Sequence, residues 1–205
     1  MNKEVPVSLV FGCGREGLNW AEKQTAIGNR WVRGLDHKNI DPSSANFVKG
    51  NILRSPFNDQ SANQIYADLI FNSVNVNDIT LSDIRNDPNI LMDKSFPESV
   101  RAWCAGKTEP QIRGNTDELR WLLKADTLRE MMRVLKTNGE IFIIDRPFIV
   151  EWIKNKACNI LEISPEKIKI EDLGITPEDH DRSLSLREIL KEGEPLAKIV
   201  INKLY

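Results

Sequence analysis

Short apolar runs alternate with helical periodicities along this chain, a pattern typical of a parallel sheet covered by helices. The run Val5–Phe11 is apolar and rich in β-branched residues, it stops at a glycine turn, and a helix from Leu18 toward Ile27 follows. The same reasoning predicts six further strands: Arg30–Asp36, Ala45–Gly50, Tyr66–Phe71, Glu140–Asp145, Lys167–Leu173 and Leu196–Asn202. We therefore expect an α/β, Rossmann-like fold: a mainly parallel seven-stranded sheet with helices on both faces. The last strand should be antiparallel, because little chain remains for a crossover before it.

The clearest helical pattern lies in the second half of the chain. Its apolar residues recur at three- and four-residue steps: Leu119, Leu122, Leu123, Leu128, Met131, Met132 and Leu135. Asn115 with Glu118 resembles a capping box at the start of this helix, and Thr137–Gly139 supplies residues that tolerate a left-handed stop. A further helix is expected to begin at Pro147, which suits a first helical turn.

A stretch of about 43 residues, 72–114, shows no clear periodicity and is predicted to be irregular. Connections of this length are uncommon in compact domains and are usually functional or disordered. We expect one domain over residues 1–205, with a lid or substrate insertion at 72–114. The alternative is a disordered insertion, since residues 83–89 form a polar, turn-rich cluster.

Composition narrows the class of protein. The 205 residues fit a single domain, and 28 basic against 30 acidic side chains give a pI near 5.8, with no clear nucleic-acid signature. No apolar run approaches the length of a membrane span, so no membrane partner is expected. Cys13, Cys104 and Cys158 have neither disulfide-framework nor metal-site spacing, which favours a reducing, cytoplasmic location and no bound metal.

The sequence Gly12-Cys-Gly-Arg-Glu-Gly17 follows the first predicted strand directly, and Asp36 ends the second about 20 residues later. Glycines are needed where backbone passes close to a ligand, and a carboxylate at the second strand end can accept hydrogen bonds from ribose hydroxyls. A bare strand-to-helix turn with a surface Asp36 is the structural alternative. The same spacing also fits NAD.

Three further segments add to the glycine loop and Asp36. They are Gly50–Ser61, Ala67–Phe71 and Met132–Ile144, and the last reads Met-Arg-Val-Leu-Lys-Thr-Asn-Gly before an apolar strand. Together with the glycine loop, and in this order, they resemble the class I S-adenosylmethionine (SAM) dependent methyltransferases. The resemblance implies transfer of the SAM methyl group to a nucleophilic acceptor, with S-adenosylhomocysteine as product. The acceptor, a small molecule or a protein, is not identified by the sequence.

The resemblance also implies a set of cofactor contacts: Gly12, Cys13, Gly14, Gly17, Asp36, His37, Asn51, Ile52, Asn72 and Ser73. The glycines would lie along the methionine and ribose, Asp36 on the ribose, Asn51 and Ile52 beside the adenine, and Asn72 and Ser73 beside the methyl group. One departure concerns Val10, which stands where the family often has an acidic residue. Another is Asn51, which replaces a common Asp.

No catalytic residue is assigned, because methyl transfer depends mainly on aligning the acceptor with an already activated methyl group. If a general base is used, His37, Asp78 and Asp145 on strand-end loops are the candidates. Two other functions remain open. An NAD-dependent oxidoreductase would usually show a catalytic group such as Tyr with Lys four residues later, which neither Tyr66 nor Tyr205 has. The second is a SAM-binding protein without catalysis.

Overall fold

The computed structural model describes residues 7–28, 31–36, 38–71, 79, 81–94 and 96–204. Over these residues the strands form one seven-stranded sheet in the order β3-β2-β1-β4-β5-β7-β6. The strands are β1 Val7–Phe11, β2 Trp31–Asp36, β3 Phe47–Lys49, β4 Ala62–Asp68, β5 Leu135–Asp145, β6 Ile168–Leu173 and β7 Ala197–Lys203. β7 is antiparallel to both of its neighbours, and the other pairs are parallel. The predicted fold class is confirmed.

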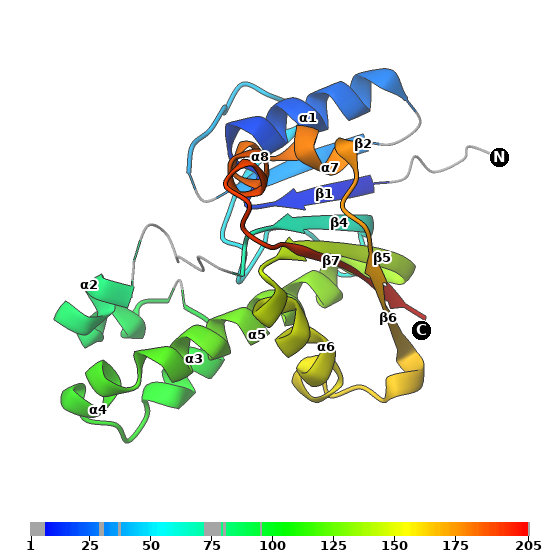
Figure 1. Ribbon diagram of the computed structural model, residues 1–205. Helices are drawn as coiled ribbons and strands as arrows, with labels where there is room; N and C mark the ends of the chain where they lie inside the picture. The colour runs from blue at the N-terminus through cyan, green and yellow to red at the C-terminus, as the bar shows by residue number, and fades with distance from the viewer. Residues whose placement is uncertain are drawn as a thin grey trace.

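Helices cover both faces of the sheet (Figure 1). They are α1 Gly14–Ile27, α2 Leu81–Asn86, α3 Glu98–Cys104, α4 Glu109–Gly114, α5 Thr116–Val134, α6 Pro147–Leu161, α7 Pro177–Arg182 and α8 Leu184–Lys191, with 3-10 helices η1 Pro88–Met92 and η2 Pro165–Lys167. Alternate residues of a strand point to opposite faces. In β1, Leu9 and Phe11 belong to the larger core with α5 and α6, while Val10 belongs to a smaller core with Trp20 of α1.

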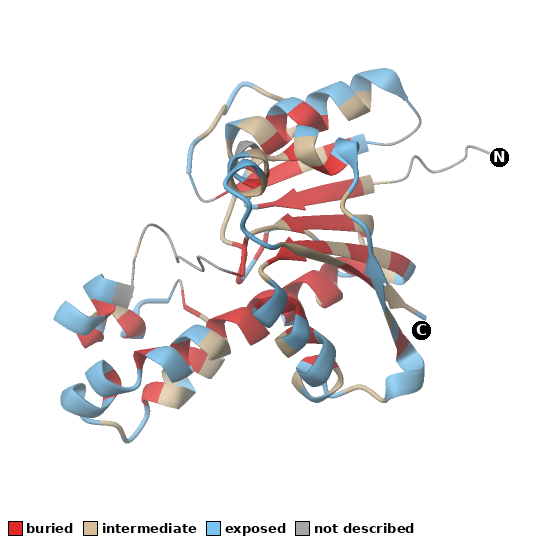
Figure 2. Cartoon of the chain, in the orientation of Figure 1, coloured by how far each residue is buried: buried red, intermediate tan, exposed pale blue. Residues whose placement is uncertain are grey.

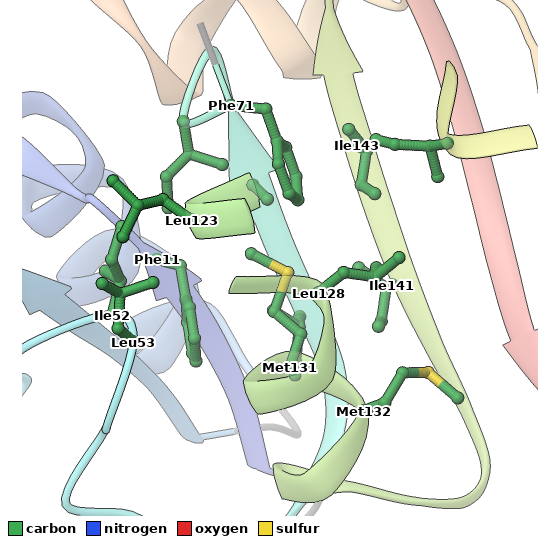
Figure 3. Close-up of a cluster of buried hydrophobic side chains, with 14 of the residues drawn as sticks. Phe11, Ile52, Leu53, Phe71, Leu123, Leu128, Met131, Met132, Ile141 and Ile143 are labelled. Carbon is green, nitrogen blue, oxygen red and sulfur yellow. The ribbon is translucent and has the colours of Figure 1, made fainter. Parts of the chain in front are cut away.

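The larger core lies where α5 packs against the middle of the sheet. Its members are buried, as the red strands and helix faces in Figure 2 show. Figure 3 shows Leu123, Leu128 and Met131 of α5 beside Phe11 of β1, with the Phe71 ring above them. Burying large side chains on both faces of the central strands explains why these strands read as continuous apolar runs in the sequence.

The prediction of an irregular stretch over 72–114 is wrong for the part that the structure describes. That part folds into α2, η1, α3 and α4, and its buried apolar side chains join the larger core: Ile84, Leu91, Phe96, Val100, Cys104 and Ile112. Short helices were missed because each carries only one or two buried positions, too few to show a period. Local caps define them instead: Asp87 accepts a hydrogen bond from the Asn89 amide, and Thr108 with Gln111 forms a capping box.

Two predicted boundaries of α5 are also wrong. Asn115 makes no side-chain cap, because the chain runs on from α4 almost without a break. At the other end no turn separates helix from strand: α5 ends at Val134 and β5 starts at Leu135. The expected stop residues lie inside β5, in an irregular pairing between Ala62↔Leu135 and Gln64↔Glu140, and Asn138 there has φ 61°. β4 likewise starts at Ala62 and ends at Asp68, earlier than predicted.

The helices were also compared with the requirements of a membrane span. In the ranges given above, none is both long enough and apolar enough to cross a bilayer.

Candidate functional site

The glycine loop leaves its backbone open at the carboxyl end of β1. Gly12 and Gly14 have φ +63° and +51°, which only glycine adopts readily. The Gly12 amide donates to the Leu35 carbonyl at 2.8 Å, so the loop is fixed to the end of β2. A Cβ atom added to Gly14 would have no heavy atom within 4 Å. The loop therefore offers free space next to backbone amides at the start of α1.

Asp36 is held against this loop. Its side chain ends β2, only 6% of the residue is exposed, and its Oδ2 accepts from the Gly14 amide at 2.9 Å. Its Oδ1 accepts from the Lys38 amide at 2.9 Å. Two backbone donors thus orient a nearly buried carboxylate at the junction of β1, β2 and α1. That orientation is absent from the bare-turn alternative, in which Asp36 is a surface residue.

A cleft of about 580 Å³ runs along this edge of the sheet, from the end of β2 past the glycine loop to the end of β4. Its volume is typical of sites for small molecules and cofactors. The lining residues are Gly12, Cys13, Gly14, Arg15, Glu16, Asp36, Lys38, Ile40, Ile52, Asp68, Leu69, Ile70, Ser183 and Ser185. The cleft lies at the carboxyl ends of parallel strands, where α/β sheets bind their ligands.

The turn that leaves β4 forms one wall of the cleft. Asp68, Leu69 and Ile70 all line it, and Leu69 has φ 55°. A left-handed conformation costs a branched residue roughly 1–2 kcal/mol, so it persists only where the surroundings enforce it. The Leu69 amide donates to the Ile144 carbonyl of β5 at 2.8 Å, which is one such restraint.

Another part of the wall comes from the connection between β6 and β7, which supplies Ser183 and Ser185. Arg182, at the end of α7, binds Asp68 through two bonds, Nε to Oδ2 at 2.5 Å and Nη2 to Oδ1 at 2.9 Å. Asp179 accepts from Arg182 and from Lys198, and the Lys198 and Thr176 bonds hold the pKa of Asp179 below its usual value although burial opposes this. The Arg182 guanidinium also lies 4.7 Å from the Tyr66 ring centroid. Ser183 and Ser185 next to it are thereby fixed beside the glycine loop.

The predicted cofactor residues fall into three groups. Gly12, Cys13, Gly14, Asp36 and Ile52 come together as lining residues of the cleft.

Other predicted residues do not line the cleft. A Cβ atom on Gly17 would lie 3.1 Å from the Cys13 Cβ and 3.4 Å from the Val10 Cγ1, so this glycine serves helix–strand packing. Asn51 accepts from the Leu53 amide at 2.9 Å in a tight turn. Val10 is buried in the smaller core, so it makes no contact in the cleft.

The last group comprises His37, Asn72, Ser73 and Asp78, which lie outside the described residues. Of the three candidate bases, only Asp145 is described. It is 0% exposed, and its oxygens accept from the Phe71 amide at 3.1 Å and the Arg146 amide at 2.8 Å. Asp145 does not line the cleft, so its place argues for holding backbone rather than for acting on a bound substrate.

Several lining residues were not identified in the sequence. Asp68 was part of a family-like segment but had no assigned role, and Ser183 and Ser185 come from a distant part of the chain. Only the fold brings α7 and α8 to the glycine loop, so no local signal marks them. Burial raises the pKa of Cys13 to about 12, and nearby Asp36 adds to this, which excludes Cys13 as a thiolate nucleophile near neutral pH. No group of three or more His, Cys, Asp or Glu side chains able to hold a metal ion occurs within the described ranges.

The chain was compared with known proteins. No family model matches it, and no curated protein matches it. Among solved structures it is similar to a SAM-dependent methyltransferase from Mesorhizobium loti, with 12% identity, coverage of 98% of this chain and 93% of the other, and a TM-score of 0.49. A SAM-dependent methyltransferase from Archaeoglobus fulgidus gives 14% identity, 98% and 87% coverage, and a TM-score of 0.46. The [4+2]-cyclase SpnF gives 10% identity, coverage of 98% of this chain and 76% of the other, and a TM-score of 0.45. Identities this low leave the function to be argued from the site.

Proposed function

We propose that this chain binds SAM in the cleft beside the glycine loop and transfers its methyl group to a nucleophilic acceptor. The observation that carries the proposal is the pairing of an open, positive-φ glycine loop with the buried carboxylate of Asp36, both lining one cleft of about 580 Å³. A carboxylate at the end of β2 suits the hydroxyls of a ribose. The distant likeness to methyltransferase structures agrees with this proposal but does not carry it.

The residues present fit the cofactor. Asp36 would hold the ribose, and Ile52, 8% exposed at the same end of the cleft, would pack against the adenine. The loop from Gly12 to Gly14, with open space beside Gly14, would lie along the amino-acid part, toward Asp68 at the end of β4. When bound, SAM supplies a methyl group already activated as a sulfonium. The chain's own contribution is then to orient the acceptor and to exclude water, which asks for a shaped wall rather than a strong acid or base.

We propose further that residues 72–114 border the acceptor site. Helices α2, α3 and α4 extend from the same edge of the sheet at which the glycine loop lies (Figure 1). They are anchored to α5, where the Arg85 guanidinium donates to the Thr116 hydroxyl at 2.8 and 2.9 Å. A helical unit attached beside the end of β4 is placed to cover an acceptor. The acceptor itself remains a small molecule or a protein.

Binding calorimetry with SAM, S-adenosylhomocysteine and NAD tests the proposal directly. Micromolar binding of SAM and S-adenosylhomocysteine without NAD is the expected result. Binding of NAD alone would instead assign an oxidoreductase site to the glycine loop. Binding of SAM with no methyl transfer to any extract of candidate acceptors would favour a binding protein without catalysis.

The contribution of Asp36 is isolated by the variant Asp36→Asn, which keeps the side-chain shape. Loss of charge-assisted hydrogen bonds should cost roughly 1.5–3 kcal/mol, or about 10- to 100-fold in affinity for S-adenosylhomocysteine. Asp59→Asn is the matched control, because Asp59 is an exposed carboxylate paired with Arg133 far from the cleft. Equal affinities of the two variants would show that Asp36 does not contribute to binding.

A further inference from the structure

A lysine and an aspartate bind the backbone amide and the backbone carbonyl of one residue, Phe71, next to the wall of the cleft. The Phe71 amide donates to Oδ2 of Asp145 at 3.1 Å, and the Phe71 carbonyl accepts a hydrogen bond from the ammonium of Lys124. Asp145 ends β5 and is 0% exposed, and Lys124 lies in the middle of α5 and is 1% exposed. The Phe71 ring itself is buried against α5, beside Leu123 (Figure 3). Both backbone polar groups of Phe71 are therefore bound by ionisable side chains inside the protein.

A buried ammonium is costly and needs an explanation. Lysine is almost never fully buried unless it is paired, and apolar residues would fill the same position on α5 without a desolvation cost. Lys124 lies within a core of leucines and methionines that already packs α5 on the sheet. Packing alone therefore does not account for it. What Lys124 adds is the bond to the Phe71 carbonyl and the attraction to Asp145.

The backbone that Lys124 and Asp145 bind adjoins the cleft wall. Phe71 directly follows Asp68, Leu69 and Ile70, the residues of the β4 exit turn that line the cleft. Leu69 in this turn has φ 55°, an unfavourable conformation that the surroundings must enforce. Three restraints act on the turn: Arg182 on Asp68, the Ile144 carbonyl on the Leu69 amide, and the Lys124–Asp145 grip on Phe71. The first two restraints act on Asp68 and Leu69 at the start of the turn, and only the third acts on Phe71 at its end.

We infer that Lys124 is a positioning residue, which together with Asp145 holds the backbone of Phe71 and so keeps the β4 exit turn in the shape that binds the cofactor. This inference rests on the proposed function of the cleft. Lys124 does not line the cleft, and it acts on the ligand only through the backbone of the turn. Removing its ammonium should release the turn and weaken binding while the sheet and α5 remain folded.

The charge on Lys124 gives a second, independent readout. Burial lowers the pKa of Lys124 from 10.5 to about 8; Asp145 from β5 raises it, and Arg120 on α5 lowers it further. The Phe71 carbonyl and the Trp121 ring, 5.4 Å from the ammonium, are its uncharged contacts. A hydrogen bond from a charged donor is stronger than one from a neutral amine. The grip should therefore weaken as the pH rises through about 8.

The test compares Lys124→Met with Lys203→Met in affinity for S-adenosylhomocysteine, measured by calorimetry from pH 7 to 9. Lys203 is a matched control: its ammonium also binds backbone carbonyls, Leu135 at 2.7 Å and Met132 at 3.0 Å, but at the opposite end of β5. We expect Lys124→Met to bind at least tenfold more weakly at pH 7 and Lys203→Met to bind like the unchanged protein. The unchanged protein and Lys203→Met should both lose affinity above pH 8, beyond any change seen in Lys124→Met.

Normal affinity of a folded Lys124→Met variant would overturn the inference, as would a pH dependence shared by all three proteins. If that variant does not fold, the Phe71 amide resonance of the unchanged protein still decides the question. Its chemical shift should change as Lys124 loses its proton, which the side-chain resonances of Lys124 follow independently. A Phe71 shift that stays constant while Lys124 titrates would contradict the contact between them. A protein that binds no S-adenosylhomocysteine but shows this titration would refute the proposed function while leaving the grip in place.

Discussion

The two edges of the sheet both concentrate charge, but they use it differently. At the carboxyl edge, charged side chains fix turns of positive φ around the cleft: Asp36 binds the Gly14 amide, and Arg182 binds Asp68 at the β4 exit turn. At the amino edge, Arg133 of α5 donates to Glu130, to Asp59 and to the Phe57 carbonyl at 2.9 Å. A smaller hollow of about 260 Å³ lies at that edge, and among the partners of Arg133 it is lined by Phe57. At the amino edge the charged side chains bind one another and backbone carbonyls, whereas at the carboxyl edge Asp36 and Asp68 also line the larger cleft.

This difference assigns different roles to sequence segments that all resemble parts of the same family. Ser55 donates to Glu130 from its amide at 2.7 Å and from its hydroxyl at 2.6 Å. Ser55 of segment 50–61 and Arg133 of segment 132–144 therefore meet at Glu130, and this scaffold joint connects the start of β4 to the end of α5. Ile52 of the first segment, in contrast, lines the cleft. The hydrogen bond between Asp36 and the glycine loop likewise shapes the lining of the cleft. We therefore expect ligand binding to depend on residues at this edge and not on those at the amino edge.

The largest effect is expected for Arg182→Met. Arg182 is 2% exposed, and its loss leaves Asp68 buried without its cationic partner, which typically costs about 3–5 kcal/mol of the free energy of unfolding. Because Asp68 lines the cleft, affinity for S-adenosylhomocysteine should fall as well. Urea unfolding and calorimetry measure the two quantities.

Arg187→Met is the control for that prediction. Arg187 of α8 is more than a third exposed and lies 3.6 Å from Glu16, so its removal should cost under about 1 kcal/mol. A similar loss of stability in both variants would show that the buried network around Asp68 contributes no more than a surface ion pair.

Gly14→Val should separate binding from folding at the carboxyl edge. The added side chain would enter the open space beside the loop, so affinity for S-adenosylhomocysteine should drop by about 100-fold or more. The φ of +51° adds a strain of roughly 1–2 kcal/mol to the folded state. Gly28→Val, at the far end of α1 with no neighbouring atom within 4 Å, is the matched control. A Gly14→Val protein that melts at a slightly lower temperature yet binds normally would show that the loop is only a turn and does not contact the ligand.

Sequence reasoning predicted the sheet because its central strands are buried on both faces and read as continuous apolar runs. It brought Gly12, Gly14 and Asp36 to one cleft because both segments end neighbouring parallel strands. It failed where a role depends on partners far along the chain. Lys124 stands among the apolar positions of its helix without any local pattern that marks it, and it contacts Phe71, 53 residues earlier in the sequence. Arg182 and Asp68 are 114 residues apart.

The short helices between residues 81 and 114 failed for another reason. Each is stabilised by a local cap and a few buried side chains rather than by a repeated apolar stripe, so periodicity gives no signal. Gly17 shows the converse error. It fits the glycine pattern of a ligand loop, but the space beside it is occupied by Cys13 and Val10. A spacing pattern does not distinguish a glycine that admits a ligand from one that admits a neighbouring strand.

The smallest effect is expected for Arg133→Met at the amino edge, where stability should change and binding should not. The variant leaves Glu130, 8% exposed, without its cation, but the Ser55 amide and hydroxyl still donate to it. Arg133 itself is about one-third exposed, so solvent screening reduces the loss to roughly 1–2 kcal/mol. Urea unfolding gives this value, and calorimetry should return the affinity of the unchanged protein. Weaker binding in Arg133→Met, matched in size by Asp36→Asn, would mean that the two edges are coupled through α5 and that the scaffold joint also sets the shape of the cleft.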